Sequence, residues 1–167
     1  MARRRTRRRG APARSTTRPS TGRSISQGYR VSSPQSERQA SVAAILAGNT
    51  VNMSLASLAI AADEELNLHL GSKMPEKTEH PHNIRAIIFQ IRNAYAHNPL
   101  KPTWRVTNPR YLQRPYSYKS GEDQISLDFS RLNGTTLDYV HFNGFDHFWS
   151  LFDDARRLVV SSSRDGR

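Results

Sequence analysis

The chain has 167 residues, no cysteine and a formal net charge of +11. Its length suits one domain with appendages, and the absence of cysteine excludes a disulfide framework and a thiolate metal site. The charge is uneven, because residues 1–35 contain ten Arg and no acid, whereas residues 36–167 carry fifteen basic and fourteen acidic side chains. The basic character therefore belongs to the N-terminal segment, and the remainder is close to neutral.

Residues 1–35 are rich in Arg, Ser, Thr, Pro and Gly and poor in large apolar side chains. Such a segment cannot bury enough surface to offset its ordering entropy, so we expect a disordered tail. An RNA-tethering arm, a nuclear or organellar address and a plain solvated tail all fit this composition. The arginines expected to bind polyphosphate non-specifically are Arg3, Arg4, Arg5, Arg7, Arg8 and Arg9.

Two helical patterns follow, at Ser36–Ala47 and Val51–His69, and Gly48-Asn49 either breaks or merely kinks them. Residues 39–62 carry no charge and could be mistaken for a membrane span. Their Asn, Thr and Ser residues instead favour a buried helical pair or one long core helix. We expect no transmembrane segment, and a cytoplasmic protein unless the arginine runs direct it to a nucleus or organelle.

After a polar loop over residues 71–81, the spacing predicts a helix from about His82 to Asn98. Asn98 precedes Pro99, so this helix should stop near His97. Arg85 and Arg92 lie along one edge of its apolar face. The residues of that face recur at i, i+3, i+4, i+7 and i+11; they are Ile84, Ile87, Ile88, Ile91 and Tyr95.

Residues 101–121, with three prolines and several aromatics, predict an ordered loop with a short strand at Trp104–Val106. Alternation predicts a half-buried strand at Gln124–Arg131 and a return strand at Thr136–Phe142, joined at Asn133-Gly134. A last helix is predicted over Phe145–Ser161. We therefore expect a mainly α domain at residues 36–161, a helical bundle with a small β-hairpin before the C-terminal helix, and disorder at 162–167.

The pattern Arg92-x4-His97, with Asn93 after the arginine, ends an isoleucine-rich helix and is followed by Asn98-Pro99. It resembles the catalytic signature of the HEPN superfamily, whose domains are helical bundles with this motif on a core helix. The resemblance covers about residues 36–161, but only residues 84–99 are specific. It implies a metal-independent endoribonuclease without a cofactor, a toxin or defence effector whose candidate partners are RNA and an antitoxin or regulatory protein.

The two motif residues suit RNA cleavage by attack of the 2′-hydroxyl on the adjacent phosphate. His97 can transfer protons, and Arg92 can donate to the phosphoryl oxygens. DNA lacks the 2′-hydroxyl and could not react in this way. Five residues of regular helix separate the two side chains by ~140° and ~7.5 Å, so one helix does not bring both to one phosphate unless its end unwinds. We therefore expect a homodimer that supplies a matching pair across a two-fold axis.

The remaining candidates have competing structural interpretations. Asn93, Asn98 and Tyr95 could support the site, although Tyr95 belongs to the apolar face and Asn98 could simply stop the helix. Arg85, Lys101 and Arg105 could guide RNA or be ordinary solvated charges. His80 and His82 could hold a metal, but no other residue at metal-site spacing supports one; His141 and His147 suit local hydrogen bonds.

Two functions without catalysis stay open. The first is a HEPN-like module that binds RNA, a nucleotide or a protein through the same surface. The second is a basic-tailed nucleic-acid-binding protein whose domain only dimerises.

Overall fold

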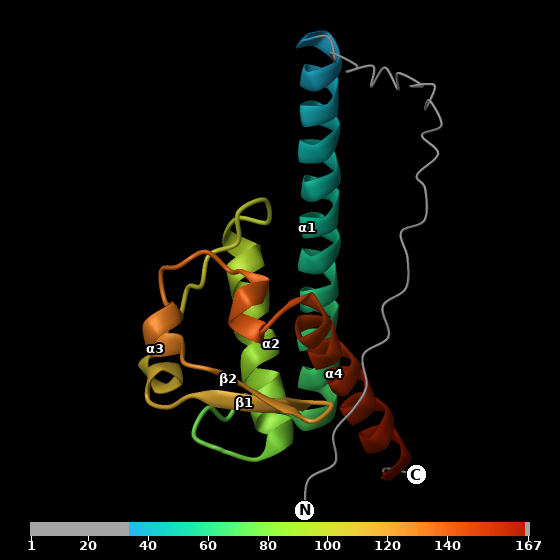
Figure 1. The fold of residues 1–167 in the computed structure, drawn as a ribbon. Helices are drawn as coiled ribbons and strands as arrows, with labels where there is room; N and C mark the ends of the chain where they lie inside the picture. The colour runs from blue at the N-terminus through green and yellow to red at the C-terminus, as the bar shows by residue number, and fades with distance from the viewer. Residues whose placement is uncertain (1–33, 166–167) are drawn as a thin grey trace, which may run out of the picture. The chain divides into compact units, whose positions relative to one another are not determined.

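The computed structural model describes residues 34–165, and the Arg-rich segment of residues 1–33 lies outside the described part (Figure 1). The described chain is mainly helical with one small two-stranded sheet before the last helix, which confirms the expected fold class. The elements in chain order are α1 (Pro34–Leu70), α2 (His80–His97), the 3-10 turn η1 (Pro109–Leu112), β1 (Tyr116–Ser120), β2 (Asp123–Leu127), α3 (Phe129–Leu132), the 3-10 turn η2 (Tyr139–Phe142) and α4 (Phe145–Asp165).

α1 is a single helix that continues through Gly48 and runs antiparallel to α2 (Figure 1). Only its C-terminal half enters the core, where Leu55, Ala59 and Leu66 are buried; its N-terminal half extends beyond the folded body. The expected core helix is therefore present over half of its length. By length and composition alone residues 38–70 could also cross a membrane, a test that core helices of soluble proteins pass as well.

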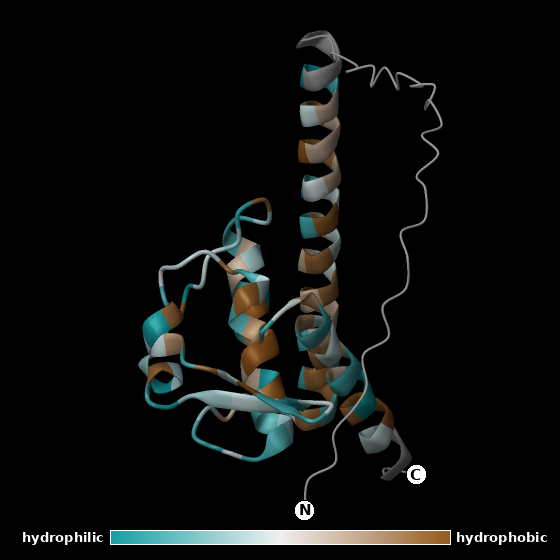
Figure 2. Ribbon diagram, in the orientation of Figure 1, coloured by the Kyte–Doolittle hydropathy of each residue, from teal (hydrophilic) through white to brown (hydrophobic). Residues whose placement is uncertain are grey.

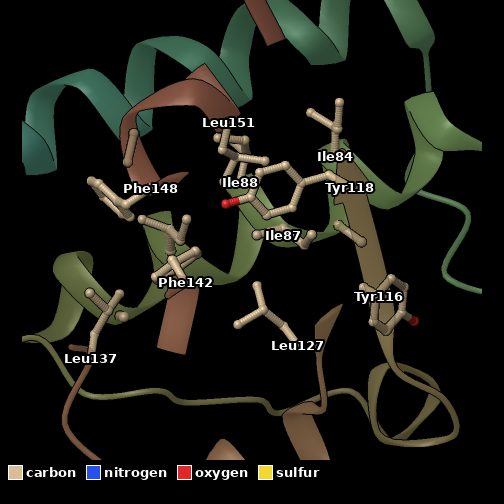
Figure 3. Packing of buried hydrophobic residues seen from close by; sticks show 14 of the residues in the cluster. Ile84, Ile87, Ile88, Tyr116, Tyr118, Leu127, Leu137, Phe142, Phe148 and Leu151 are labelled. Carbon is tan, nitrogen blue, oxygen red and sulfur yellow. The ribbon is translucent and has the colours of Figure 1, made fainter. Parts of the chain in front are cut away.

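α2 lies at the centre of the core and packs against α1, β1 and α4. Ile84, Ile87 and Ile88 are fully buried, and Figure 3 shows them facing Tyr118 of β1 and Leu151 of α4. Burying one such side chain contributes on the order of 1.5–3 kcal/mol, so this face holds α2 in place. In Figure 2 the middle turns of α2 are coloured as hydrophobic.

The β-hairpin lies earlier in the chain than the sequence suggested. β1 pairs antiparallel with β2, with Tyr118 opposite Ile125, and Gly121 turns between them at φ +62. β2 therefore matches the first half of the strand expected at 124–131, while its partner comes from the segment expected to be a loop. The return strand expected at Thr136–Phe142 is wrong.

Two aspartates explain this difference, because each starts a helical turn where a strand was expected. Asp128 Oδ1 accepts from the Ser130 backbone N–H at 3.0 Å and begins α3. Asp138 Oδ1 accepts from the Val140 N–H at 3.0 Å and begins η2. Capping side chains of this kind favour helical turns over extended chain.

The C-terminal end also differs from expectation. α4 runs to Asp165, four residues beyond Ser161, where the sequence placed the end of the last helix.

The strand expected at Trp104–Val106 is reduced to an isolated bridge between Thr103 and Thr136. The Trp104 N–H donates to Thr135 O at 2.9 Å, and its carbonyl accepts from Gly134 N–H at 2.8 Å. The Trp104 indole is buried and donates to His141 Nδ1 at 3.1 Å. Residues 102–106 are thereby tied to the chain between α3 and η2.

Tyr111 supplies a pH test of this core. Burial raises the pKa of Tyr111 to about 12, whereas an unfolded tyrosine ionises near pH 10. The stability that it contributes is complete below pH ~10 and is lost as the pH rises towards ~12, because only the unfolded chain releases the proton. Two pKa units correspond to about 3 kcal/mol.

We therefore expect Tyr111→Phe to flatten the alkaline fall in the free energy of unfolding, measured by urea denaturation across this pH range. An identical slope in the wild type and the variant would contradict the assignment.

Candidate functional site

The end of α2 is fixed by Asn98. The helix stays regular through His97, and Asn98 adopts extended backbone at the C-cap. The Asn98 Oδ1 accepts from the backbone N–H groups of Leu100 and Lys101 at 3.2 and 3.1 Å, which reverses the chain. Asn52 of α1 donates to Leu100 O at 3.3 Å and holds this turn beside the middle of α1. Asn98 is thus the helix stop that the sequence allowed.

His97 is exposed and lies next to a guanidinium group from the following segment. The Arg105 Nη1 is 3.4 Å from His97 Nδ1. Because a guanidinium only donates, Nδ1 is the acceptor in this contact and the ring proton lies on Nε2. In this tautomer Nε2 can only donate, and the basic lone pair of the ring on Nδ1 faces Arg105.

The position of Arg105 is fixed by the burial of the residues on either side of it. Trp104 and Val106 are both buried, and the Val106 N–H donates to Asn133 Oδ1 at 2.9 Å. Arg105 therefore projects outward between two anchored residues. The sequence suggested that Arg105 could guide RNA, but it did not reveal the contact with His97. The alternation of apolar and polar residues at 104–106 was the signal that the Arg105 side chain points outward.

Arg92 is half-buried, and its Nη1 donates to Asn93 Oδ1 at 3.2 Å. Asn93 is therefore in contact with the Arg92 guanidinium. Because α2 does not unwind before Pro99, Arg92 and His97 keep the separation of a regular helix, ~140° and ~7.5 Å. Within one chain, Arg105 rather than Arg92 meets the imidazole.

The cations around the end of α2 are not neutralised by nearby acids. Over residues 34–165 the structure shows no ion pair for Arg92, Lys101 or Arg105. By contrast, Arg131, Arg156 and Arg157 each pair with an aspartate one turn away. Positive groups without an internal counter-ion are suited to an anionic ligand such as phosphate.

Two other sequence candidates lie inside the protein. Tyr95 is buried, and burial raises its pKa above the usual value, so its interpretation as a core residue is confirmed. Arg85 is only 1% exposed and donates to Asn67 Oδ1 at 2.6 Å, while burial lowers its pKa. Its expected contact with RNA is corrected accordingly, because α1 covers that edge of α2.

A second polar cluster, which the sequence did not reveal, joins the β-hairpin to α4. His147 Nδ1 is 2.8 Å from Ser120 Oγ, and its Nε2 is 3.5 Å from an Asp123 carboxylate that is 65% exposed. Ser150 Oγ donates to Ser120 Oγ at 2.7 Å, and the Tyr118 hydroxyl donates to His147 O at 2.6 Å. We interpret this network as an attachment, since it ties both ends of the hairpin turn to the first turns of α4.

The described part of the chain shows no group of three or more His, Asp or Glu side chains placed to hold a metal ion. His80 and His82 lie in the first turn of α2 rather than in a loop.

Comparison of the chain with protein-family models, with curated proteins and with solved structures gives no match. The candidate functional residues therefore come from the structure itself. They lie in the last two turns of α2 and in the segment that follows it, and they are Arg92, His97, Lys101 and Arg105.

The burial of Arg85 predicts a structural rather than a functional effect of its removal. Arg85→Ala should lower the free energy of unfolding by about 3 kcal/mol, because it empties volume in the core and removes the cation beside Asp63. The exposed Arg110 is the matched control, and Arg110→Ala should change stability by less than about 0.5 kcal/mol. Urea denaturation measures both; equal effects would show that Arg85 is not held in the core.

Proposed function

We propose that this chain is a HEPN-like, metal-independent endoribonuclease whose reacting group is His97. The observation that carries the proposal is the exposed His97 imidazole at the end of α2, 3.4 Å from the Arg105 guanidinium. The lack of an ion pair at Arg105 and Lys101 within residues 34–165 supports it, because unpaired cations near a proton-transfer group suit a phosphodiester. The motif Arg92-x4-His97 adds the resemblance to HEPN nucleases.

The reaction consists of a single transfer at phosphorus. The ribose 2′-hydroxyl loses its proton to a base, its oxygen bonds to phosphorus, and the bond to the 5′-oxygen breaks as that oxygen gains a proton. The products are a 2′,3′-cyclic phosphate and a 5′-hydroxyl end. For His97 to act as the base through Nε2, the ring hydrogen must move to Nδ1, which frees the Arg105 guanidinium from Nδ1 to donate towards the phosphoryl oxygens.

We further propose that two copies of the chain complete the site. A regular α2 keeps Arg92 away from the phosphate that its own His97 would contact, and a partner related by a two-fold axis can supply Arg92 from the opposite side. A second His97 would then be present as the complementary acid or base. An antitoxin or regulatory protein that covers this surface would inhibit the nuclease.

The first test is cleavage of single-stranded RNA in excess chelator. We expect His97→Ala to lower kcat by a factor of about 10²–10⁴, since it removes proton transfer. Arg92→Ala should lower kcat by about 10²-fold through the loss of charge stabilisation. RNA methylated at the 2′-oxygen should resist cleavage, and product ends should carry cyclic phosphate.

The matched control is His69→Ala, because His69 is also exposed and also lies in the last turn of a helix. It should cleave like the wild type. Equal activity in the wild type and both motif variants would end the nuclease proposal. RNA affinity that survives without any turnover would favour the binding module instead.

Arg105 and Lys101 should separate chemistry from binding. We expect Arg105→Ala to lower kcat at least about tenfold, because its guanidinium contacts the reacting imidazole. Lys101 is exposed and contacts the site only through its backbone, so Lys101→Ala should mainly raise KM and weaken the salt dependence. Steady-state kinetics at two salt concentrations measure both; a pure KM effect of Arg105→Ala would remove it from the chemical step.

A further inference from the structure

The network that attaches the β-hairpin to α4 brings a serine, a histidine and an aspartate into contact where the hairpin turn lies beside α4 (Figure 1). His147 Nδ1 lies 2.8 Å from Ser120 Oγ, and its Nε2 lies 3.5 Å from Asp123 Oδ2. A carboxylate only accepts, so the hydrogen of the neutral ring lies on Nε2, and Nδ1 accepts from the Ser120 hydroxyl. A hydroxyl that donates to an imidazole, which a carboxylate in turn orients, is the arrangement of an activated nucleophile.

The attachment does not require this placement of the imidazole. The Tyr118 hydroxyl donates to the His147 carbonyl oxygen at 2.6 Å and already ties the main chain of α4 to β1. Ser150 Oγ donates to Ser120 Oγ at 2.7 Å, which leaves the Ser120 hydrogen for His147. The hairpin is thus held against α4 without the ring, and the ring is free to carry a proton.

Ser120 borders a depression of a size that suits a small molecule. The depression holds about 550 Å³, and Ser120 lines it together with Gly121, the next residue. Gly121 lies outside the β1–β2 ladder, which ends at the pair of Ser120 and Asp123, so the ladder does not use the Gly121 N–H. The backbone N–H after a nucleophilic serine can donate to the oxyanion that forms when the serine attacks a carbonyl. A nucleophile, a base and an oxyanion donor therefore lie at one depression.

The charges around the depression favour a substrate with an anionic group. Its two acids already have partners within α4. Arg157 Nη1 lies 3.3 Å from Asp154 Oδ1, and Arg156 Nε lies 3.9 Å from the Asp153 carboxylate. Lys119 also lines the depression and has no ion pair within residues 34–165. Its ammonium is therefore available to an anionic group of a ligand.

We propose that Ser120 is the nucleophile of an esterase site with His147 as its base and a small anionic ester as its substrate. Ser120 Oγ bonds to the acyl carbon while its proton passes to His147 Nδ1, and the bond to the alkoxy oxygen breaks as that oxygen takes the proton from Nδ1. Water then attacks the acyl carbon and gives a proton to Nδ1, and Ser120 Oγ leaves and recovers that proton. The products are a carboxylic acid and an alcohol. Asp123 is a positioning residue that stabilises the imidazolium.

The test is hydrolysis of the p-nitrophenyl half-ester of succinate by the full chain, together with labelling by a fluorophosphonate probe. The wild type should release p-nitrophenol faster than buffer alone, and mass spectrometry should locate the label on Ser120. Ser120→Ala should lose both, and His147→Gln should lower kcat by a factor of about 10²–10⁴. Absence of turnover in the wild type, or a label on other residues only, would overturn the proposal.

The matched control is Ser117→Ala, because Ser117 lies on the same strand and its hydroxyl bonds to Ser126 Oγ at 3.4 Å rather than to an imidazole. It should hydrolyse the ester like the wild type. His97→Ala should do so as well, since this site does not depend on the proposed ribonuclease. Equal losses in Ser117→Ala and Ser120→Ala would refute Ser120 as the nucleophile.

The pH profile separates proton transfer from attachment. The titratable groups in contact with His147 are Asp123 of β2 and Tyr118 of β1. The wild-type rate should rise between about pH 5 and 8, where imidazoles lose their proton, because His147 accepts a proton only when neutral. His80→Gln removes the other imidazole at the depression and should keep this rise, whereas His147→Gln should abolish it. A rise that persists in His147→Gln would refute His147 as the base.

Lys119 determines the charge of the preferred ester. Lys119→Ala should raise KM for the succinate half-ester about threefold with kcat unchanged, because an exposed ion pair contributes below about 1 kcal/mol. It should leave the KM for neutral p-nitrophenyl butyrate as it is. An equal change in KM for both esters would contradict an anionic substrate.

Discussion

The burial of one face of α2 is the constraint on which the rest of the structure depends. Ile84, Ile87, Ile88 and Ile91 have no exposed surface, and α2 meets α1, β1 and α4 through them and their neighbours. A helix held on several sides cannot rotate or slide without losing several buried side chains at once. The position and orientation of His97 at the end of α2 are therefore fixed by the buried face of the helix.

The sequence predicted an element best where a single hydrophobic spacing determined it. The spacing of isoleucines located α2 to within two residues at its N-terminal end, and the pair Asn98-Pro99 located its end. The alternation of Ile125 and Leu127 located β2 but not its partner, because pairing is decided by contacts across the chain. At Asp128 and Asp138 the alternation predicted a strand, but the aspartate side chain accepts a hydrogen bond from a backbone N–H two residues later. Such a bond favours a helical turn over extended chain.

The candidate site shows the same division. Sequence placed Arg92 and His97 correctly on one helix and at its end, since both follow from helical spacing. It could not show that Arg85 faces Asn67 on α1, because the two edges of a narrow apolar face look alike until a neighbouring helix covers one of them. Nor could it show that Arg105 reaches His97, a contact that depends on how residues 102–106 pair with residues 134–137.

The surroundings of the end of α2 therefore depend on residues that lie much later in the chain. His141 Nδ1 accepts from the Trp104 indole and from the Asp138 N–H, and Trp104 in turn carries Arg105. The group that contacts the imidazole is thus placed by η2, some forty residues further along the chain. Because α2 is regular to its end, Arg92 is excluded from the same contact, and Arg105 takes the place beside His97.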